Sequence, residues 1–117
     1  MQSLLKLFAK LLMVASLLSV GSTMAQSPPS MNDIYATAKA GKLDEAQVMV
    51  QQVLISYPKS AKAYFVQAEL YSRQGKLDRA RESLSNAEKY APGLPFAKAE
   101  AVQALRAQLA TQSVVKP

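Results

Sequence analysis

The stretch GKLDEA at residues 41–46 returns 34 residues later as GKLDRA at residues 75–80. The same offset brings Pro58 onto Pro92. Self-similarity at a fixed period of this length is typical of stacked units, each made of two helices joined by a turn. The sequence therefore predicts an all-α fold that contains two such units.

The signals that start and end helices recur within each unit. Gly41 and Gly75 follow a helical run, and glycine readily takes the left-handed conformation that ends a helix. Asp44 and Asp78 suit the first turn of the next helix, because a helix N-terminus carries a partial positive charge. We predict helices at residues 31–40, 44–57, 61–74, 78–91 and 95–111. Each second helix has one packing stripe at helical spacing, formed by Ala46, Val50, Val53 and Tyr57 in the first unit and by Ala80, Leu84, Ala87 and Ala91 in the second.

The second unit resembles the tetratricopeptide repeat in the order of its aromatic, small, glycine, alanine, large apolar and proline positions. These positions hold Tyr64, Ala68, Tyr71, Gly75, Ala80, Leu84, Ala87 and Pro92. In the first unit, Ser30 and Thr37 stand at the two aromatic positions, so the length of its first helix stays open and it is expected to form a polar cap. The resemblance implies a short right-handed superhelical array.

The resemblance also implies how the array is divided. The repeat domain covers residues 31–111, with two repeats and a capping helix at about residues 27–60, 61–94 and 95–111. Pro95 suits the first position of the capping helix. Val102, Leu105 and Leu109 form its apolar stripe. Residues 112–117 are expected to form a disordered tail.

The inventory of side chains argues against most catalytic chemistry. The 117 residues include no cysteine and no histidine, so a thiolate nucleophile, a disulfide and the usual metal ligands are missing. Carboxylates remain, but they fall on first turns or outer faces, or pair locally as Glu69 does with Arg73 four residues later. No glycine-rich phosphate loop is present. We predict no enzyme activity and no cofactor, with carboxylate catalysis as the only enzyme class left open.

The net charge of +6 does not indicate a nucleic-acid partner. Lys76, Arg79 and Arg81 form the main basic cluster, but Asp78 and Glu82 interleave with it. Proteins that bind phosphate backbones concentrate charge of one sign instead. The resemblance to the tetratricopeptide repeat implies a protein or peptide as the partner instead.

Residues 1–25 have the layout of a secretory signal peptide: Lys6 and Lys10, an apolar run at residues 11–20, and small residues that end at Ala25. The run is about half of the ~20 residues that span a bilayer, so we expect cleavage after Ala25 and no stable membrane insertion. The mature chain would begin with a polar leader at residues 26–30. We expect an exported protein, periplasmic in a bacterium or secreted.

Similarity to the family places the first helix of each pair, together with the cap, along a concave groove. The residues that this implies for the groove are Tyr35, Lys39, Lys62, Phe65, Glu69, Arg73, Phe96 and Arg106. Tyr35 and Phe65 would make apolar contacts, while the lysines and Arg73 attract acidic groups of the partner. The alternative is an ordinary solvated face whose aromatic residues only support packing.

A second candidate interface lies on the other side of the first repeat. Val48 and Ile55 are seven residues apart, opposite the packing stripe, and their counterparts one period later are Glu82 and Lys89. A face that is apolar in one copy and charged in the other suggests a cover: the first helix, the leader, or another subunit in an isologous dimer. Two isolated surface aliphatic residues are the alternative.

The function that we predict is an exported scaffold or adaptor that binds another protein or peptide. The alternative is a structural or assembly subunit of a larger complex, with a homodimer through Val48 and Ile55 as one form of it. Both follow from the resemblance and from the two surfaces, and neither names a partner.

Overall fold

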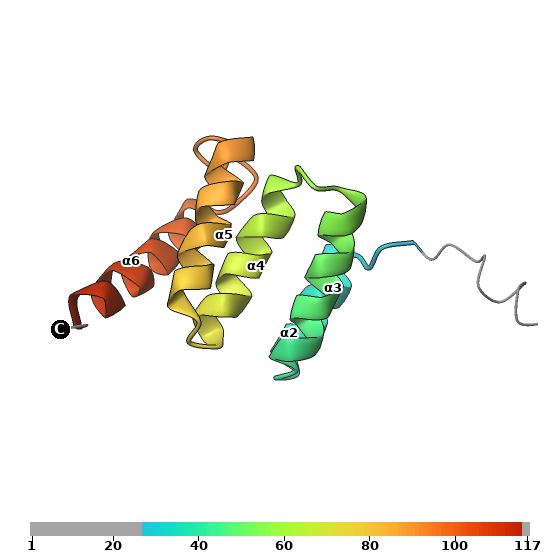
Figure 1. The fold of residues 1–117 in the computed structure, drawn as a ribbon, viewed down its shortest axis with the longest axis horizontal. Helices are drawn as coiled ribbons and strands as arrows, with labels where there is room; N and C mark the ends of the chain where they lie inside the picture. Colours follow the sequence, from blue (N-terminus) through green and yellow to red (C-terminus); the bar gives the residue numbers. More distant parts are fainter. Residues whose placement is uncertain (1–26, 116–117) are drawn as a thin grey trace, which may run out of the picture.

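The computed structural model describes residues 27–115, which form a short array of antiparallel helix pairs (Figure 1). The helices are α2 (Met31–Lys39), α3 (Leu43–Ser56), α4 (Ala61–Arg73), α5 (Leu77–Tyr90) and α6 (Ala99–Val115). The described residues contain no strand, so the predicted all-α repeat fold is confirmed. The predicted signal peptide at residues 1–25 lies outside the described residues.

The turn within each pair is made as the sequence predicts. Gly41 and Gly75 have φ values of +85° and +77°, in the left-handed region. The residue after each glycine then donates its backbone N–H to a carbonyl five residues earlier: Lys42 to Thr37 at 3.2 Å, and Lys76 to Tyr71 at 2.8 Å. These bonds satisfy carbonyl groups that a helix end would leave without a partner.

Two helices begin at a serine cap that the sequence analysis did not identify. The Ser30 hydroxyl accepts a hydrogen bond from the Asp33 backbone N–H at 3.1 Å, and the Ser60 hydroxyl accepts one from the Ala63 backbone N–H at 3.2 Å. Such caps satisfy N–H groups that the first turn cannot pair. The Ser30 cap settles the length of the first helix, which starts at Met31 and ends at Lys39.

The core consists of two clusters of buried side chains, and α4 contributes to both. The first joins α2, α3 and α4, and includes Ile34, Val50, Val66 and Leu70. The second joins α4, α5 and α6, and includes Phe65, Leu84, Leu94, Val102, Leu105 and Leu109. Buried alanines at the contacts between helices let the backbones approach closely. The stripe predicted on α6 is therefore confirmed, and α6 covers the open face of the second repeat.

Two members of the predicted stripes lie outside the helices. Tyr57 is exposed because it caps the C-terminus of α3, where the backbone has turned away from the helical direction. Ala91 is the corresponding cap of α5. The prolines that follow, Pro58 and Pro92, keep both helices from continuing.

The last helix differs most from its prediction. It starts at Ala99 and not at Pro95, and residues 91–98 form a loop instead. The reason is that the backbone at Gly93 and Leu94 is in the left-handed region, with φ values of +81° and +51°, so the chain turns at these residues before the helix can begin. Leu94 is nevertheless only 1% exposed, because its side chain packs into the second core cluster. The loop is thus held by its own buried side chain.

The C-terminal boundary also differs. The helix α6 runs to Val115, so the backbone of residues 112–115, expected to be disordered, is helical. No proline or glycine lies between Ala99 and Lys116 that would end it earlier. Residues 116–117 lie outside the described part.

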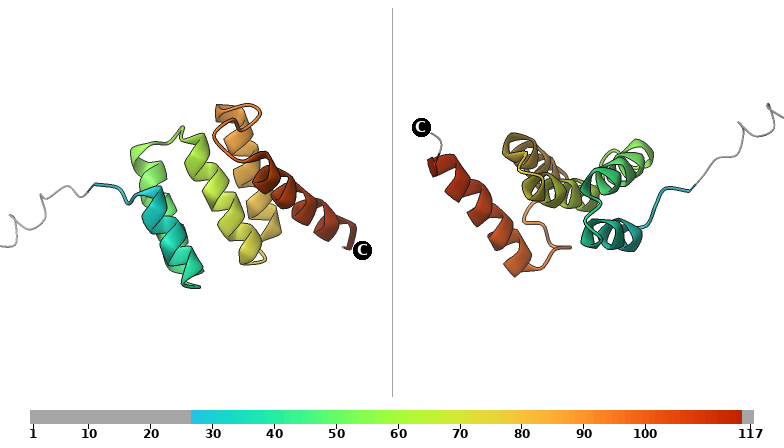
Figure 2. Two further views of the ribbon diagram at one scale, coloured as in Figure 1. Left: turned by 180° about the vertical axis from the view of Figure 1, so that it is seen from behind. Right: turned by 90° about the horizontal axis from the view of Figure 1, so that it is seen from below.

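Seen from below, α3 and α5 lie on one side of the array, while α2, the loop of residues 91–98 and α6 lie on the other (Figure 2). The loop therefore runs over the side on which the first helices of the pairs are accessible. Within residues 27–115, no helix is both long enough and apolar enough to cross a membrane.

Candidate peptide-binding groove

A cavity of about 410 Å³ opens between α2, α4 and the loop that precedes α6. Four segments line it: α2 with Tyr35; α4 with Lys62, Phe65 and Glu69; the loop with Phe96, Ala97 and Lys98; and α6 with Ala101. Five of the eight residues predicted for the groove therefore meet here. We call this cavity the groove.

The floor of the groove is aromatic. Phe65 is only 3% exposed and belongs to the second core cluster, whereas Phe96 is 39% exposed. The two rings pack edge to face, with centroids 5.9 Å apart and an interplanar angle of 76°. This arrangement suits the charge distribution of aromatic rings. Phe96 can therefore contact a ligand, while Phe65 mainly supports Phe96 from below.

Tyr35 and Glu69 form one wall of the groove. The Tyr35 hydroxyl donates a hydrogen bond to Glu69 Oε1 at 3.1 Å. The two residues are 34 positions apart, so they occupy the same place in successive repeats. Burial and the nearby Glu69 carboxylate raise the pKa of Tyr35, which keeps its hydroxyl protonated as a donor. The stacking of the repeats thus builds the wall.

The pKa of Glu69 is raised above its ordinary value, chiefly because burial disfavours the charged carboxylate. The hydrogen bond from Tyr35 and the positive charge of Arg73 act in the opposite direction. Glu69 is the only acidic residue that lines the groove. Among the described residues, no group of three or more acidic side chains is placed to hold a metal ion.

We expect the raised pKa of Glu69 to make stability depend on pH. The folded state retains this proton at pH values where the unfolded chain has lost it, so the contribution of Glu69 to stability is greatest below the ordinary glutamate pKa of about 4.3 and falls as pH rises through the folded-state pKa. In Glu69→Gln, the free energy of unfolding should therefore decrease less with rising pH than it does in wild type. Urea denaturation at several pH values between about pH 4 and pH 7 measures this dependence. Glu82→Gln, at an exposed position of α5, should keep the wild-type slope, and an equal slope in Glu69→Gln would contradict the prediction.

Two lysines give the mouth of the groove a positive charge. Lys62 lies in the first turn of α4, and Lys98 directly precedes α6. Both side chains are exposed, and within residues 27–115 neither forms an ion pair. Their ammonium groups are therefore available to an anionic group that approaches the groove.

Two other cations that were predicted for the groove lie beyond its lining. Lys39 is in the last turn of α2. Arg73 is in the last turn of α4, where its Nη2 donates a hydrogen bond to the Ala38 carbonyl oxygen at 3.3 Å. The Ala38 carbonyl oxygen also accepts the Gly41 backbone N–H at 2.9 Å, so Arg73 is a second donor at the C-terminal end of α2, where a positive charge is favourable.

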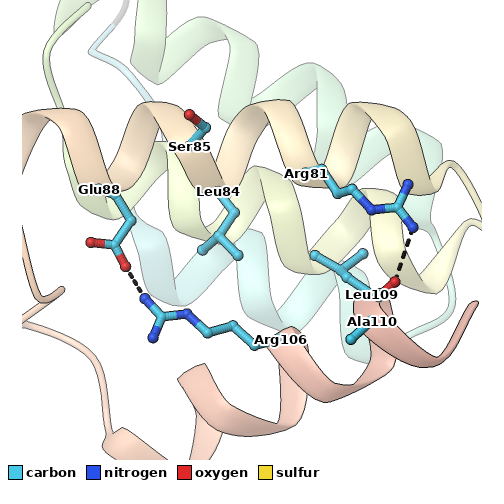
Figure 3. A pocket seen from close by; sticks show the side chains of 7 residues that line it. All are labelled: Arg81, Leu84, Ser85, Glu88, Arg106, Leu109 and Ala110. Carbon is cyan, nitrogen blue, oxygen red and sulfur yellow. Dashed lines mark hydrogen bonds and ion pairs between the residues drawn. The ribbon is translucent and has the colours of Figure 1, made fainter. Parts of the chain in front are cut away.

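Arg106 lies in a different place from the predicted one. It forms an ion pair with Glu88 of α5, beside a shallow cavity of about 330 Å³ between α5 and α6 (Figure 3). Glu88 also accepts the Gly93 backbone N–H at 3.2 Å. On the same side, Arg81 reaches across from α5 to the Leu109 carbonyl oxygen at 2.9 Å (Figure 3). Because Val102, Leu105 and Leu109 fill the inward face of α6, Arg106 emerges toward α5.

Ala97, Lys98 and Ala101 line the groove and were missed by the sequence analysis. A helix from residue 95 would have placed them differently. The available signal was the pair Pro92 and Gly93, which is typical of a turn.

The second candidate interface is exposed as predicted. Val48 is 59% exposed and Ile55 is 74% exposed. Ser27 and Pro28 of the leader lie beside Ile55 but leave it open, and α2 packs on the opposite side of α3. Within the described residues, neither the first helix nor the leader covers this face.

Helix pairs at a 34-residue period, with a groove on the side of their first helices, define an α-helical repeat protein. A family model for the tetratricopeptide repeat matches residues 38–109. The match covers more than half of the chain, so the chain belongs to the tetratricopeptide repeat family. Members of this family generally act as scaffolds for protein–protein interaction. No curated protein and no solved structure matches the chain.

Proposed function

We propose that this protein is a non-catalytic scaffold whose groove holds a short segment of a partner protein. The observation that carries the proposal is the groove itself, where the aromatic side chains of Tyr35, Phe65 and Phe96 lie beside Lys62 and Lys98. We further propose that the protein is exported, most simply to a periplasm, on the basis of the signal-peptide pattern of residues 1–25. N-terminal sequencing of the mature protein would contradict export if it began at Met1.

The bound segment should carry a large apolar side chain with a carboxylate close to it. A volume of about 410 Å³ accommodates one leucine or phenylalanine side chain with part of its backbone. Burying such a side chain is worth about 1.5–3 kcal/mol, whereas an exposed ion pair contributes about 0.2–1 kcal/mol. The apolar anchor therefore supplies most of the affinity, and Lys62 and Lys98 select for an acidic neighbour.

Phe96 is the best position at which to test the groove, because it is exposed and its removal leaves the core clusters in place. We expect Phe96→Ala to weaken binding at least about tenfold, equivalent to about 1.4 kcal/mol of lost apolar contact. The probes are peptides selected on the wild-type protein from a displayed library of short random sequences. Fluorescence anisotropy then gives the dissociation constant of each for wild type and variant.

Matched controls separate the groove from general effects. Tyr57→Ala removes an exposed aromatic residue outside the groove and should leave binding unchanged. The double variant Lys62→Glu and Lys98→Glu should bind the selected peptides more weakly than wild type does. The double variant Lys42→Glu and Lys76→Glu, which changes lysines outside the groove, should bind them as wild type does. Selected peptides that are rich in lysine, or binding that survives Phe96→Ala, would refute the groove.

A second candidate function is that of a structural subunit in a larger assembly. It is favoured by Val48 and Ile55, which are exposed on α3 although the equivalent positions of α5 are charged. Crosslinking in the native compartment distinguishes the two roles. A permanent complex of fixed stoichiometry favours the subunit, and exchangeable peptide-like ligands favour the groove.

A further inference from the structure

We infer that a second copy of this chain covers the exposed face of α3, so that two copies pair through antiparallel α3 helices. This outer α3 face consists of Val48, Gln51, Gln52 and Ile55, all of them exposed. The helix α3 lies on the side of the array away from α2 and α6 (Figure 2), and it packs against α2 and α4 through other residues, so the inference does not depend on the peptide groove.

The outer α3 face is unusual for its lack of charge. From Ala46 to Tyr57 the sequence contains no acidic or basic residue. A solvated face of a helix normally carries charged side chains, and the central part of a protein interface is depleted of them. The composition of α3 is therefore that of an interface rather than of a free surface.

The second repeat serves as an internal comparison. One period later, the same four positions of α5 hold Glu82, Ser85, Asn86 and Lys89. Because α5 is packed in the array as α3 is, stacking of the repeats does not require aliphatic residues at these positions. Packing within the array therefore does not explain why residues 48 and 55 are aliphatic, and we attribute them to a contact made outside the array.

The outer α3 face is complementary to itself when two copies run antiparallel. A two-fold axis between Gln51 and Gln52 places Val48 against Ile55 of the second copy, and the two glutamines against each other. The same register brings Asp44, in the first turn of α3, to the C-terminal end of α3 of the second copy, and the exposed Lys59 lies in the turn that follows that end. A parallel pair would instead place acid beside acid, which is unfavourable.

The charged ends are suitably exposed for this pairing. Asp44 accepts a hydrogen bond from Gln74 Nε2 at 2.6 Å, which holds its carboxylate in position. Within residues 27–115, Lys59 forms no ion pair. Antiparallel helices also place the positive end of each dipole beside the negative end of the other.

The dimer is expected to be weak. One helix face is smaller than the ~800 Å² per partner that is typical of a stable interface. We therefore expect reversible association, with a dissociation constant on the order of 10–100 μM. Ser27 and Pro28, which lie beside Ile55, would border the contact.

Sedimentation equilibrium of the purified protein over a range of concentrations tests the association. Wild type should show a monomer–dimer equilibrium, and Val48→Glu with Ile55→Glu should weaken it at least about tenfold, because each carboxylate then faces a carboxylate of the second copy. This variant should fold, because both positions are exposed and the equivalent positions of α5 carry charged residues. Lys62→Glu in the groove is the control and should dimerise as wild type does. A wild type that stays monomeric, or a dimer that the double change leaves intact, would overturn the inference.

Disulfide trapping tests the orientation of the two helices. The sequence contains no native cysteine, so only the introduced cysteines can form a disulfide. In the antiparallel register, Val48 lies next to Ile55 of the second copy but about 10 Å along the axis from Val48 of that copy. A disulfide needs Cα atoms about 4.4–6.8 Å apart. Val48→Cys mixed with Ile55→Cys should crosslink much faster than either variant alone. Equal crosslinking by Val48→Cys alone would overturn the antiparallel arrangement.

Discussion

Replacing Phe65 with alanine is expected to lower the free energy of unfolding by about 3–5 kcal/mol. Phe65 is 3% exposed and is the aromatic residue of the cluster that joins α4, α5 and α6. Its removal leaves a void beneath Phe96, against which it packs edge to face. Since small domains are stable by about 5–15 kcal/mol, this single change removes a large part of the total.

Urea denaturation followed by circular dichroism measures the effect of Phe65→Ala. Phe96→Ala is the matched control, because the partly exposed ring contributes less burial, and we expect it to cost about 1 kcal/mol. A loss below that value in Phe65→Ala would contradict the placement of Phe65 in the core. If Phe65→Ala strongly lowers the free energy of unfolding, weak peptide binding by this variant can result from unfolding and does not test the groove. Phe96 is therefore the better position at which to test peptide binding.

Leu94→Ala is expected to cost about 2–5 kcal/mol. Leu94 is 1% exposed, and it anchors the loop of residues 91–98 in the second core cluster. Its left-handed backbone, with φ of +51°, costs about 1–2 kcal/mol for a residue with a Cβ atom. The burial of the side chain outweighs this strain, and alanine keeps the strain while it loses the burial.

Leu94→Gly sharpens this prediction. At most buried positions glycine is worse than alanine, because it increases the entropy of the unfolded chain. At residue 94, glycine also removes the strain of the left-handed backbone. We therefore expect the Leu94→Gly variant to be at least as stable as the Leu94→Ala variant. Thermal and urea denaturation of the two variants compare them directly. If Leu94→Ala is clearly the more stable, the left-handed conformation of this residue is wrong.

Much of the fold follows from features that are local in the sequence. The repeat at Gly41 and Gly75 predicted both tight turns, and the apolar spacing predicted the buried stripes of α3, α5 and α6. The first four helices end within one residue of their predicted bounds. Such features can be read from the sequence because helix periodicity and glycine turns depend on residues a few positions apart.

The groove was predicted only in part, and the reason is the loop before α6. Tyr35, Lys62, Phe65 and Glu69 line it because α2 and α4 are regular repeat elements, whereas Phe96 lines it from the loop and not from the helix predicted to start at Pro95. Lys98 was missed and Arg106 was misplaced, since both depend on where α6 begins and which way it faces. Phe65 lines the groove, but it is buried in the core and has little surface left to contact a ligand.

The 34-residue period is enough to predict a stack of helix pairs, and the composition is enough to show that cysteine and histidine are missing. Those conclusions rest on periodicity and on the inventory of side chains, which need no knowledge of distant contacts. The path of residues 91–98, the burial of Phe65 and the side of α6 that carries Arg106 became known from the fold. These depend on packing between segments far apart in the chain, where burial of Leu94 outweighs a backbone conformation that leucine alone would avoid.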